Sequence, residues 1–288
     1  MNRLQLRHIL CPMDLSAISM NALMWANAIA RARAAELRAF HVDATEGLVA
    51  TGGLGFHEQE DLMEKLREAL FNVDPENRRI GAAVRRGDPG TQILQFARSL
   101  PSDLVVMGAA GADRPTRPVG SVTATVVARA DCPVLIVPAG RQVDRSRHGV
   151  FHTLMCAVDL DPASVDVIRQ ALSLGWETQG RVLCVCVMTE QNPSLSEIED
   201  LVLAAIPPEA RAWCAIEVVV KRGVPAVEIA KVAEASNVDL LVIGPPRQWT
   251  STTQAVLTKS LCPVLVTHDA RPLPYPGTAW TPAASPSD

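Results

Sequence analysis

The feature that most restricts the fold of this 288-residue chain is an internal repeat that spans most of its length. Residues of the same type recur in three sets, and each set has its own spacing. At a spacing of 145 the pairs are Cys11 and Cys156, Asp14 and Asp159, and Val42 and Val187. At 136 they are Gly87 and Gly223, Ile93 and Ile229, Asp103 and Asp239, and Gly108 and Gly244; at 130 the triplet Cys132-Pro-Val134 returns as Cys262-Pro-Val264. This pattern predicts a tandem duplication of one domain, with a second copy shorter by nine residues and then by six.

The first copy has the pattern of alternating strands and helices. Apolar runs predict strands at 8–14, 37–43, 79–86, 104–107 and 134–137. The stretches between them carry apolar residues at helical spacing, as at 58–71. Strands and helices that alternate in this way form parallel sheets with right-handed crossovers. We therefore expect an α/β fold in both halves.

The segment from 103 to 123 has the pattern of a strand, a phosphate loop and a helix start. Residues 104–107 are all apolar, which is typical of a strand buried on both faces. Gly108 and Gly111 lack a Cβ where the backbone turns sharply or approaches a ligand. Ser121 and Thr123 begin a second helix, whose unpaired N–H groups and dipole favour an anion. The segment predicts a phosphate site; the alternative is that the glycines serve only tight turns.

The repeat and the composition divide the chain into three parts. Residues 1–140 form the predicted N-terminal domain and 150–269 the predicted C-terminal domain, with a polar linker at 141–149. Both domains have an ordinary size. Residues 270–288 are rich in proline and small polar residues and lack a core-forming pattern, so we expect a disordered tail.

The charge balance argues against a general nucleic-acid binder. The net charge is −4, whereas contacts to a phosphate backbone need a basic surface. No apolar run reaches the roughly 18 to 20 residues of a membrane span, and the first residues do not have the pattern of a signal segment. We expect a cytoplasmic protein without a membrane partner.

The cysteines do not predict a disulfide framework or a metal site. Their number is odd, seven, and most lie in apolar strand-like runs, which indicates reduced, buried thiols. Cys184 and Cys186 face the same side of a strand, but two ligands are too few for zinc. The six histidines show no metal-like spacing.

With these residues placed, the chain resembles a tandem universal stress protein of the UspA superfamily. ATP-binding members carry Gly, two residues, Gly, nine residues, and then Gly-Ser or Gly-Thr. Gly108, Gly111 and Gly120-Ser121 match this signature, with eight residues in the longer gap. The resemblance implies two five-stranded, parallel, Rossmann-like domains with strand order 3-2-1-4-5 and helices on both faces. It also implies a pseudo-dimer joined through the fifth strands, 134–137 and 264–267.

The resemblance further assigns an adenine-nucleotide site to the first half. The matching residues are Pro12, Asp14, Ser16, Val42, Gly108, Gly111, Gly120, Ser121, Val122 and Thr123. Those at the end of the first strand are expected at the nucleoside, with Asp14 near the ribose, and the backbone of Val42 is expected to read adenine. The segment 121–123 is expected to hold the phosphates. This location agrees with ligand binding at the carboxyl ends of strands where sheet order reverses. The implied ligand is ATP, with or without Mg²⁺.

The second half departs from the signature. Its counterparts of Gly111, Gly120 and Ser121 are Arg247, Thr250 and Ser251. Two prolines, at 245 and 246, supply no backbone N–H. We expect a degenerate site that binds ATP weakly or not at all, although Arg247 offers a guanidinium to another anion.

No enzyme signature accompanies the site. The Walker-type phosphate loop, the dinucleotide fingerprint, the nucleophile elbow and the His-Glu-x-x-His motif do not occur in the sequence. We therefore assign no catalytic residue and expect at most weak ATP hydrolysis by a positioned water. The hypothesis is an ATP-binding stress-response regulator that meets a protein partner or forms a homodimer. The alternatives are a nucleotide-independent scaffold, or Asp14 and Asp159 that merely cap the helices after them.

Overall fold

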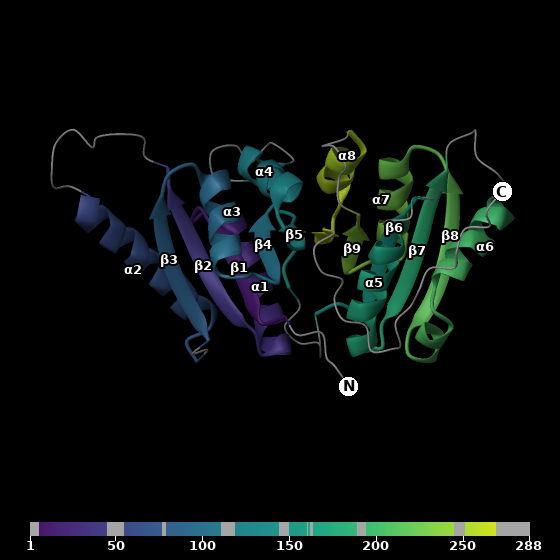
Figure 1. Cartoon of the computed structure of the whole chain (residues 1–288), viewed down its shortest axis with the longest axis horizontal. Coiled ribbons are helices and arrows are strands. Elements are labelled where there is room, and N and C mark those ends of the chain that lie inside the picture. Colours follow the sequence, from purple (N-terminus) through teal and green to yellow (C-terminus); the bar gives the residue numbers. More distant parts are fainter. Residues whose placement is uncertain are drawn as a thin grey trace.

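The computed structural model describes residues 6–44, 55–76, 79–110, 119–143, 150–159, 161, 164–188, 194–244 and 251–268. Within these residues, ten strands form one sheet with helices on both faces (Figure 1). The predicted tail at 270–288, residues 144–149 of the predicted linker and Gly111 lie outside the described residues. None of the helices in the described ranges is long and apolar enough to cross a bilayer.

Both halves alternate strands and helices, as the sequence predicts. The first half comprises β1 (His8–Met13), α1 (Ala17–Arg33), β2 (Glu36–Asp43), α2 (Gly55–Val73), β3 (Ile80–Arg86), α3 (Pro89–Ser99), β4 (Leu104–Gly108), α4 (Ser121–Arg129) and β5 (Val134–Val137). The second comprises β6 (Thr153–Val158), α5 (Ser164–Thr178), β7 (Arg181–Met188), α6 (Leu195–Ala205), the 3₁₀ helix η1 (Pro208–Ala212), β8 (Ala215–Arg222), α7 (Pro225–Ala235), β9 (Leu240–Ile243), α8 (Ser251–Lys259) and β10 (Val264–Val266).

The strand order confirms the predicted topology. The sheet runs β3-β2-β1-β4-β5-β10-β9-β6-β7-β8, so each half has the order 3-2-1-4-5 in its own numbering. Neighbouring strands are parallel within each half. The halves meet where β5 and β10 pair antiparallel, with Leu135 opposite Leu265. The predicted pseudo-dimer through the fifth strands is therefore present.

Side chains of the strands alternate between two cores, as the pleat requires. Ile9 and Cys11 pack into the core that α1, α2, α5 and α6 cover, whereas Leu10 packs into the core under α3, α4, α7 and α8. Each of these apolar clusters contains residues of both halves. Burial on both faces explains why the inner strands have continuous apolar runs.

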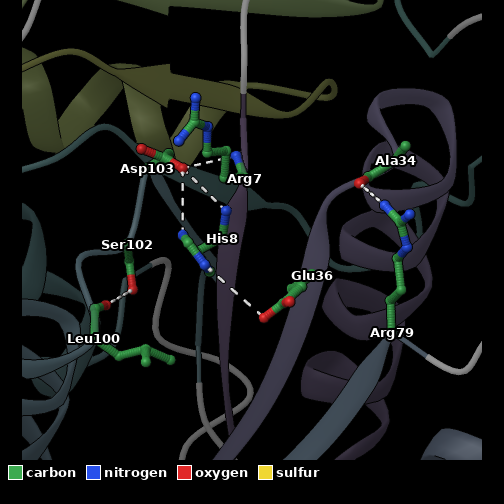
Figure 2. A network of polar contacts seen from close by, with 8 residues as sticks. All are labelled: Arg7, His8, Ala34, Glu36, Arg79, Leu100, Ser102 and Asp103. Carbon is green, nitrogen blue, oxygen red and sulfur yellow. Dashed lines mark hydrogen bonds and ion pairs between the residues drawn. The ribbon is translucent and has the colours of Figure 1, made fainter.

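A carboxylate at the start of β4 fixes the start of β1, and the repeat reproduces this clamp. Asp103 Oδ2 accepts hydrogen bonds from the backbone N–H groups of Arg7 (2.7 Å) and His8 (2.9 Å), as Figure 2 shows. Asp239 Oδ2 accepts from the N–H groups of His152 and Thr153, both at 3.0 Å. The repeated aspartates are therefore structural, and they lie at the amino ends of the strands.

The described end of the predicted linker is fixed between the halves. The carbonyl of Arg141 accepts hydrogen bonds from Asn21 Nδ2 and Trp25 Nε1, both at 2.9 Å. Its guanidinium lies 3.6 Å from Asp239 Oδ1 in the second half. The ring of Trp25 also stacks on Phe151, with 5.9 Å between centroids. The linker thus begins as a packed segment that contributes to the interface.

The seven cysteines are free thiols, and six are buried. Cys156 and Cys184 lie on neighbouring strands with their sulfur atoms 3.4 Å apart. Burial raises the pKa of Cys11 well above its usual range and that of Cys214 to about 11. These observations support the interpretation of the cysteines as small core residues.

Replacement of Asp103 by alanine is expected to lower the free energy of unfolding by about 1–3 kcal/mol, because two backbone N–H groups lose a charged acceptor. Asp239→Ala should produce a loss of the same size. Glu36→Ala is the matched control, since this exposed carboxylate only approaches His8 at 3.9 Å (Figure 2) and should matter by less than about 0.5 kcal/mol. Urea titration measures all three; equal effects at 36 and 103 would contradict the clamp.

Cys132 is expected to react with thiol reagents far more slowly in the native protein than in the unfolded chain. Cys132 is the one cysteine of the seven that is part-exposed, but its partial burial, with repulsion from Asp131 and Asp103, raises its pKa from 9.0 to about 12. At pH 8 its thiolate fraction, and hence its labelling rate, should fall about a thousandfold. Labelling with and without urea, followed by mass spectrometry, measures this ratio. Fast labelling of Cys132 in the native protein would show that its thiol is accessible and would contradict the raised pKa.

Candidate functional site

A cavity of about 570 Å³ lies at the carboxyl ends of β1, β2 and β4. The amino-terminal turns of α3 and α4 close it on the other side. These are the strands around the point where the order of the first half reverses, since β1 lies between β2 and β4. An open α/β sheet places its ligand crevice at this point.

Most of the residues predicted from the sequence meet in this cavity. Those that line it are Pro12, Asp14, Val42, Gly108, Gly120, Ser121, Val122 and Thr123. Ser16 does not belong to the described lining; it is the N-cap of α1, and its hydroxyl oxygen accepts from the backbone N–H of Ser19 at 3.2 Å. Gly111 lies outside the described residues.

The amino terminus of α4 differs from that of its neighbours in how it is capped. Ser16 caps α1 and Asp88 caps α3, and in each case the side chain accepts a backbone N–H of the first turn. Hydrogen bonds from Thr91 accordingly lower the pKa of Asp88. The cap of α4 is Gly120, which has no side chain to offer. The first N–H groups of α4 are therefore left to the cavity, where they and the helix dipole favour an anion.

Gly108 and Thr123 line the cavity and also position this helix. A Cβ on Gly108 would lie 2.6 Å from Cγ2 of Ile18, so close packing of α1 on the end of β4 requires glycine. The hydroxyl of buried Thr123 donates to the carbonyl of Gly108 at 3.0 Å. The N–H of Gly120 donates to Ala109 O at 2.8 Å. These contacts fix the start of α4 against the end of β4.

Asp14 is exposed at the edge of the cavity. Its Oδ1 accepts from the backbone N–H of Ser16 at 3.0 Å, across a turn in which Leu15 has a positive φ of 63°. The cap of α1 is Ser16, so Asp14 shapes the turn before the helix instead of capping it directly. Within the described lining it is the sole charged residue.

Part of the lining is formed by large apolar side chains, and sequence reasoning did not identify most of them as site residues. Phe40, Ile93 and Met107 line the cavity, and Phe40 stacks on Phe96 with ring centroids 4.3 Å apart. The guanidinium of Arg85 lies over the other ring of this pair, 5.1 Å from the Phe96 centroid. Periodicity marks these residues as core, and only their position at strand and helix ends brings them to a cavity.

The described lining has the features of a binding site. An uncapped helix start suits an anion, and an apolar wall suits a flat hydrophobic ring. No cluster of three or more His, Cys, Asp or Glu side chains with the geometry of a metal site occurs among the described residues. The described lining also contains no histidine or cysteine that could serve as a base or nucleophile.

The equivalent place in the second half is built differently. Asp159 Oδ1 accepts from the N–H of Asp161 at 3.0 Å, just as Asp14 accepts from Ser16, but it also accepts from the hydroxyl of Ser164 (2.6 Å), the first residue of α5. A Cβ on Gly244 would meet Val167 at an ordinary 3.4 Å, so packing does not require glycine there. Residues 245–250, which include Arg247 and Thr250, lie outside the described ranges. The shared strand frame therefore carries a different local structure.

Comparison with known proteins places the chain in a family. The sequence profile described as "Universal stress protein family" matches residues 5–138 and 151–268. A universal stress protein of Methanocaldococcus jannaschii is 33% identical in an alignment of 138 positions that covers 46% of this chain and 81% of that protein.

Two solved structures share the fold over almost the whole chain. A universal stress protein from Archaeoglobus fulgidus has a TM-score of 0.70 at 22% identity and covers 92% of this chain and 97% of its own. A functionally unknown protein from Pseudomonas aeruginosa has a TM-score of 0.62 at 18% identity, with coverages of 93% and 94%. The two profile matches fall on the two halves of the repeat and together span most of the sequence. The chain therefore belongs to the universal stress protein family.

Proposed function

We propose that the N-terminal half binds ATP in the 570 Å³ cavity, and that its occupancy regulates how the protein meets a partner during stress. The observation that carries this proposal is the start of α4, where a glycine cap leaves the first amides to the cavity. The volume lies within the range of roughly 300–1,000 Å³ that is common for small-molecule sites.

The two sides of the cavity suit the two ends of a nucleotide. The apolar wall, with Phe40 and Ile93, offers a surface for the adenine ring, next to the backbone of Val42. Asp14 stands at the edge, where its carboxylate can accept a ribose hydroxyl. The amides of Ser121 and Val122 then face the phosphates. This pose uses the residues expected from the family signature.

The proposal is for binding rather than turnover. Asp14, the one carboxylate in the described lining, is placed at the nucleoside, so phosphate oxygens and water would supply most ligands of any Mg²⁺. Without a positioned general base, hydrolysis of the bound nucleotide should be slow. The occupied fraction of the site would then follow the concentration of the nucleotide. A protein partner or a second copy of the chain would then bind differently to the protein with an occupied cavity and to the protein with an empty one. The cytoplasm is the expected compartment, because buried free thiols are typical of reducing conditions.

Gly120→Glu is expected to weaken ATP binding about a hundredfold or more, because a carboxylate then faces the phosphates at the start of α4. Gly120 has φ −72° and ψ 156°, a conformation that any residue adopts, so the fold should persist. The matched control is Thr250→Glu at the equivalent position of the second half. Calorimetric titration with ATP measures the affinities of the wild-type protein and of both variants. Unchanged binding by Gly120→Glu, with normal circular dichroism, would refute the site.

Stripped wild-type protein is expected to bind about one ATP per chain. The second half lacks the signature and ties Asp159 to α5, so it should not add a second site. Titration after removal of any copurified nucleotide gives the stoichiometry. Two ATP per chain would refute the degenerate second site, and none at millimolar ATP would favour the nucleotide-independent scaffold.

A further inference from the structure

A second cavity, of about 430 Å³, lies between the two halves at the amino ends of the strands. It is at the opposite end of β4 from the proposed nucleotide site, because it is lined by Leu104 at the start of that strand. The remaining lining comes from the ends of α1 and α5, from β5, β9 and β10, and from the segments before β1 and β6. The cavity therefore belongs to the junction and not to either half alone.

Most of the residues that line the cavity come from equivalent positions of the two halves. Three pairs of apolar side chains that occupy equivalent positions of the two halves face it: Ile29 and Leu174, Leu104 and Leu240, and Leu135 and Leu265. All six are at most 7% exposed. The cavity thus lies on the pseudo-twofold axis, and its walls are apolar side chains of both halves.

Such a space is suited to an apolar occupant. Water in a cavity needs two to four polar partners, and aliphatic walls do not supply them. Cavities lined by Leu, Ile and Phe remain dry and take up apolar molecules. The shape of the junction therefore favours a bound hydrocarbon group.

The two halves differ at the polar edge of the cavity. This difference determines which polar group an apolar ligand could carry at that edge. Arg33 at the end of α1 lines one side, whereas Thr178 occupies the equivalent position of α5. Both are part-exposed, so they lie on the solvent side of the buried leucines. Asp103 also lines the cavity, but its Oδ2 accepts from two backbone N–H groups of the β1 start (Figure 2). A guanidinium has five N–H donors and can pair an anion in addition to its other contacts.

We propose that this cavity binds a linear medium-chain carboxylate, with the alkyl chain between the paired leucines and the carboxylate on Arg33. The site is independent of the nucleotide proposal, because none of its lining residues belongs to the ATP cavity. It would let the protein respond to free acyl chains through the same junction that joins its halves.

The first experiment is a chain-length series with the full-length wild-type protein. Calorimetric titration with hexanoate, octanoate and decanoate, each below its micelle concentration, should show affinity that rises about fourfold per added CH₂. Decanol should bind about tenfold more weakly than decanoate, because it lacks the charge that pairs with the guanidinium. Affinity that does not depend on chain length would overturn the proposal. A cavity filled by a segment of this chain would leave decanoate without binding, and that result overturns it too.

Paired variants distinguish binding in the cavity from nonspecific binding at the protein surface. Arg33→Gln should weaken decanoate about tenfold and leave decanol within about twofold. Arg31→Gln is the control, since Arg31 lies in the same helix turn but pairs with Asp74, 3.2 Å away, and should leave both ligands unchanged. Leu174→Trp should fill the cavity and abolish binding of both ligands; Ile29→Phe is the milder substitute if that variant does not fold. Retained binding in a folded filled variant, or equal losses at 31 and 33, would refute the site.

Discussion

The antiparallel pairing of β5 with β10 is the constraint on which the rest of the structure depends. Each is a short, fully apolar strand at the edge of its own half, and no β5 residue is more than 2% exposed in the assembled sheet. Unpaired, each strand would present open N–H and C=O groups beside buried leucines, which is the usual template for aggregation. Tandem duplication supplies the partner strand within one chain. The repeated triplets Cys132-Pro-Val134 and Cys262-Pro-Val264 lead into these two strands.

A second preserved element keeps the amino ends of the sheet in register. Asp103 and Asp239 each accept two backbone N–H groups from the segment that begins the first strand of their half. Gly87 and Gly223, with φ of 131° and 145°, adopt a conformation that side chains rarely tolerate, at the turns into α3 and α7. These repeated residues maintain the frame. Their recurrence is thus evidence about folding, and it carries no information on whether both halves bind a ligand.

The fold could be predicted from the sequence because strands, helices and the duplication leave regular patterns, and the strand order followed from the resemblance. The candidate site was predictable only in part. A match to a signature does not distinguish a residue that contacts a ligand from one that supports it. Gly108 is required by Ile18, and the hydroxyl proton of Thr123 is committed to Gly108 O. Phe40 and Ile93 read as core residues in the sequence, because exposure to a cavity depends on which strand ends meet in space.

In this fold, a ligand site can form where the backbone N–H groups at the start of a helix have no partner within the chain. α1, α3 and α6 begin with side-chain caps, which are provided by Ser16, Asp88 and Ser194. α7 also lacks a capping side chain, but it begins with a proline, which has no N–H, and its cap Val224 is 64% exposed to solvent. α4 combines a glycine cap with a cavity. Water satisfies an uncapped start on the surface, whereas inside a cavity a bound anion does so more strongly, since few waters compete. The glycine cap at Gly120 therefore distinguishes the start of α4, where we propose that a ligand binds, from the helix starts that a side chain of this chain caps.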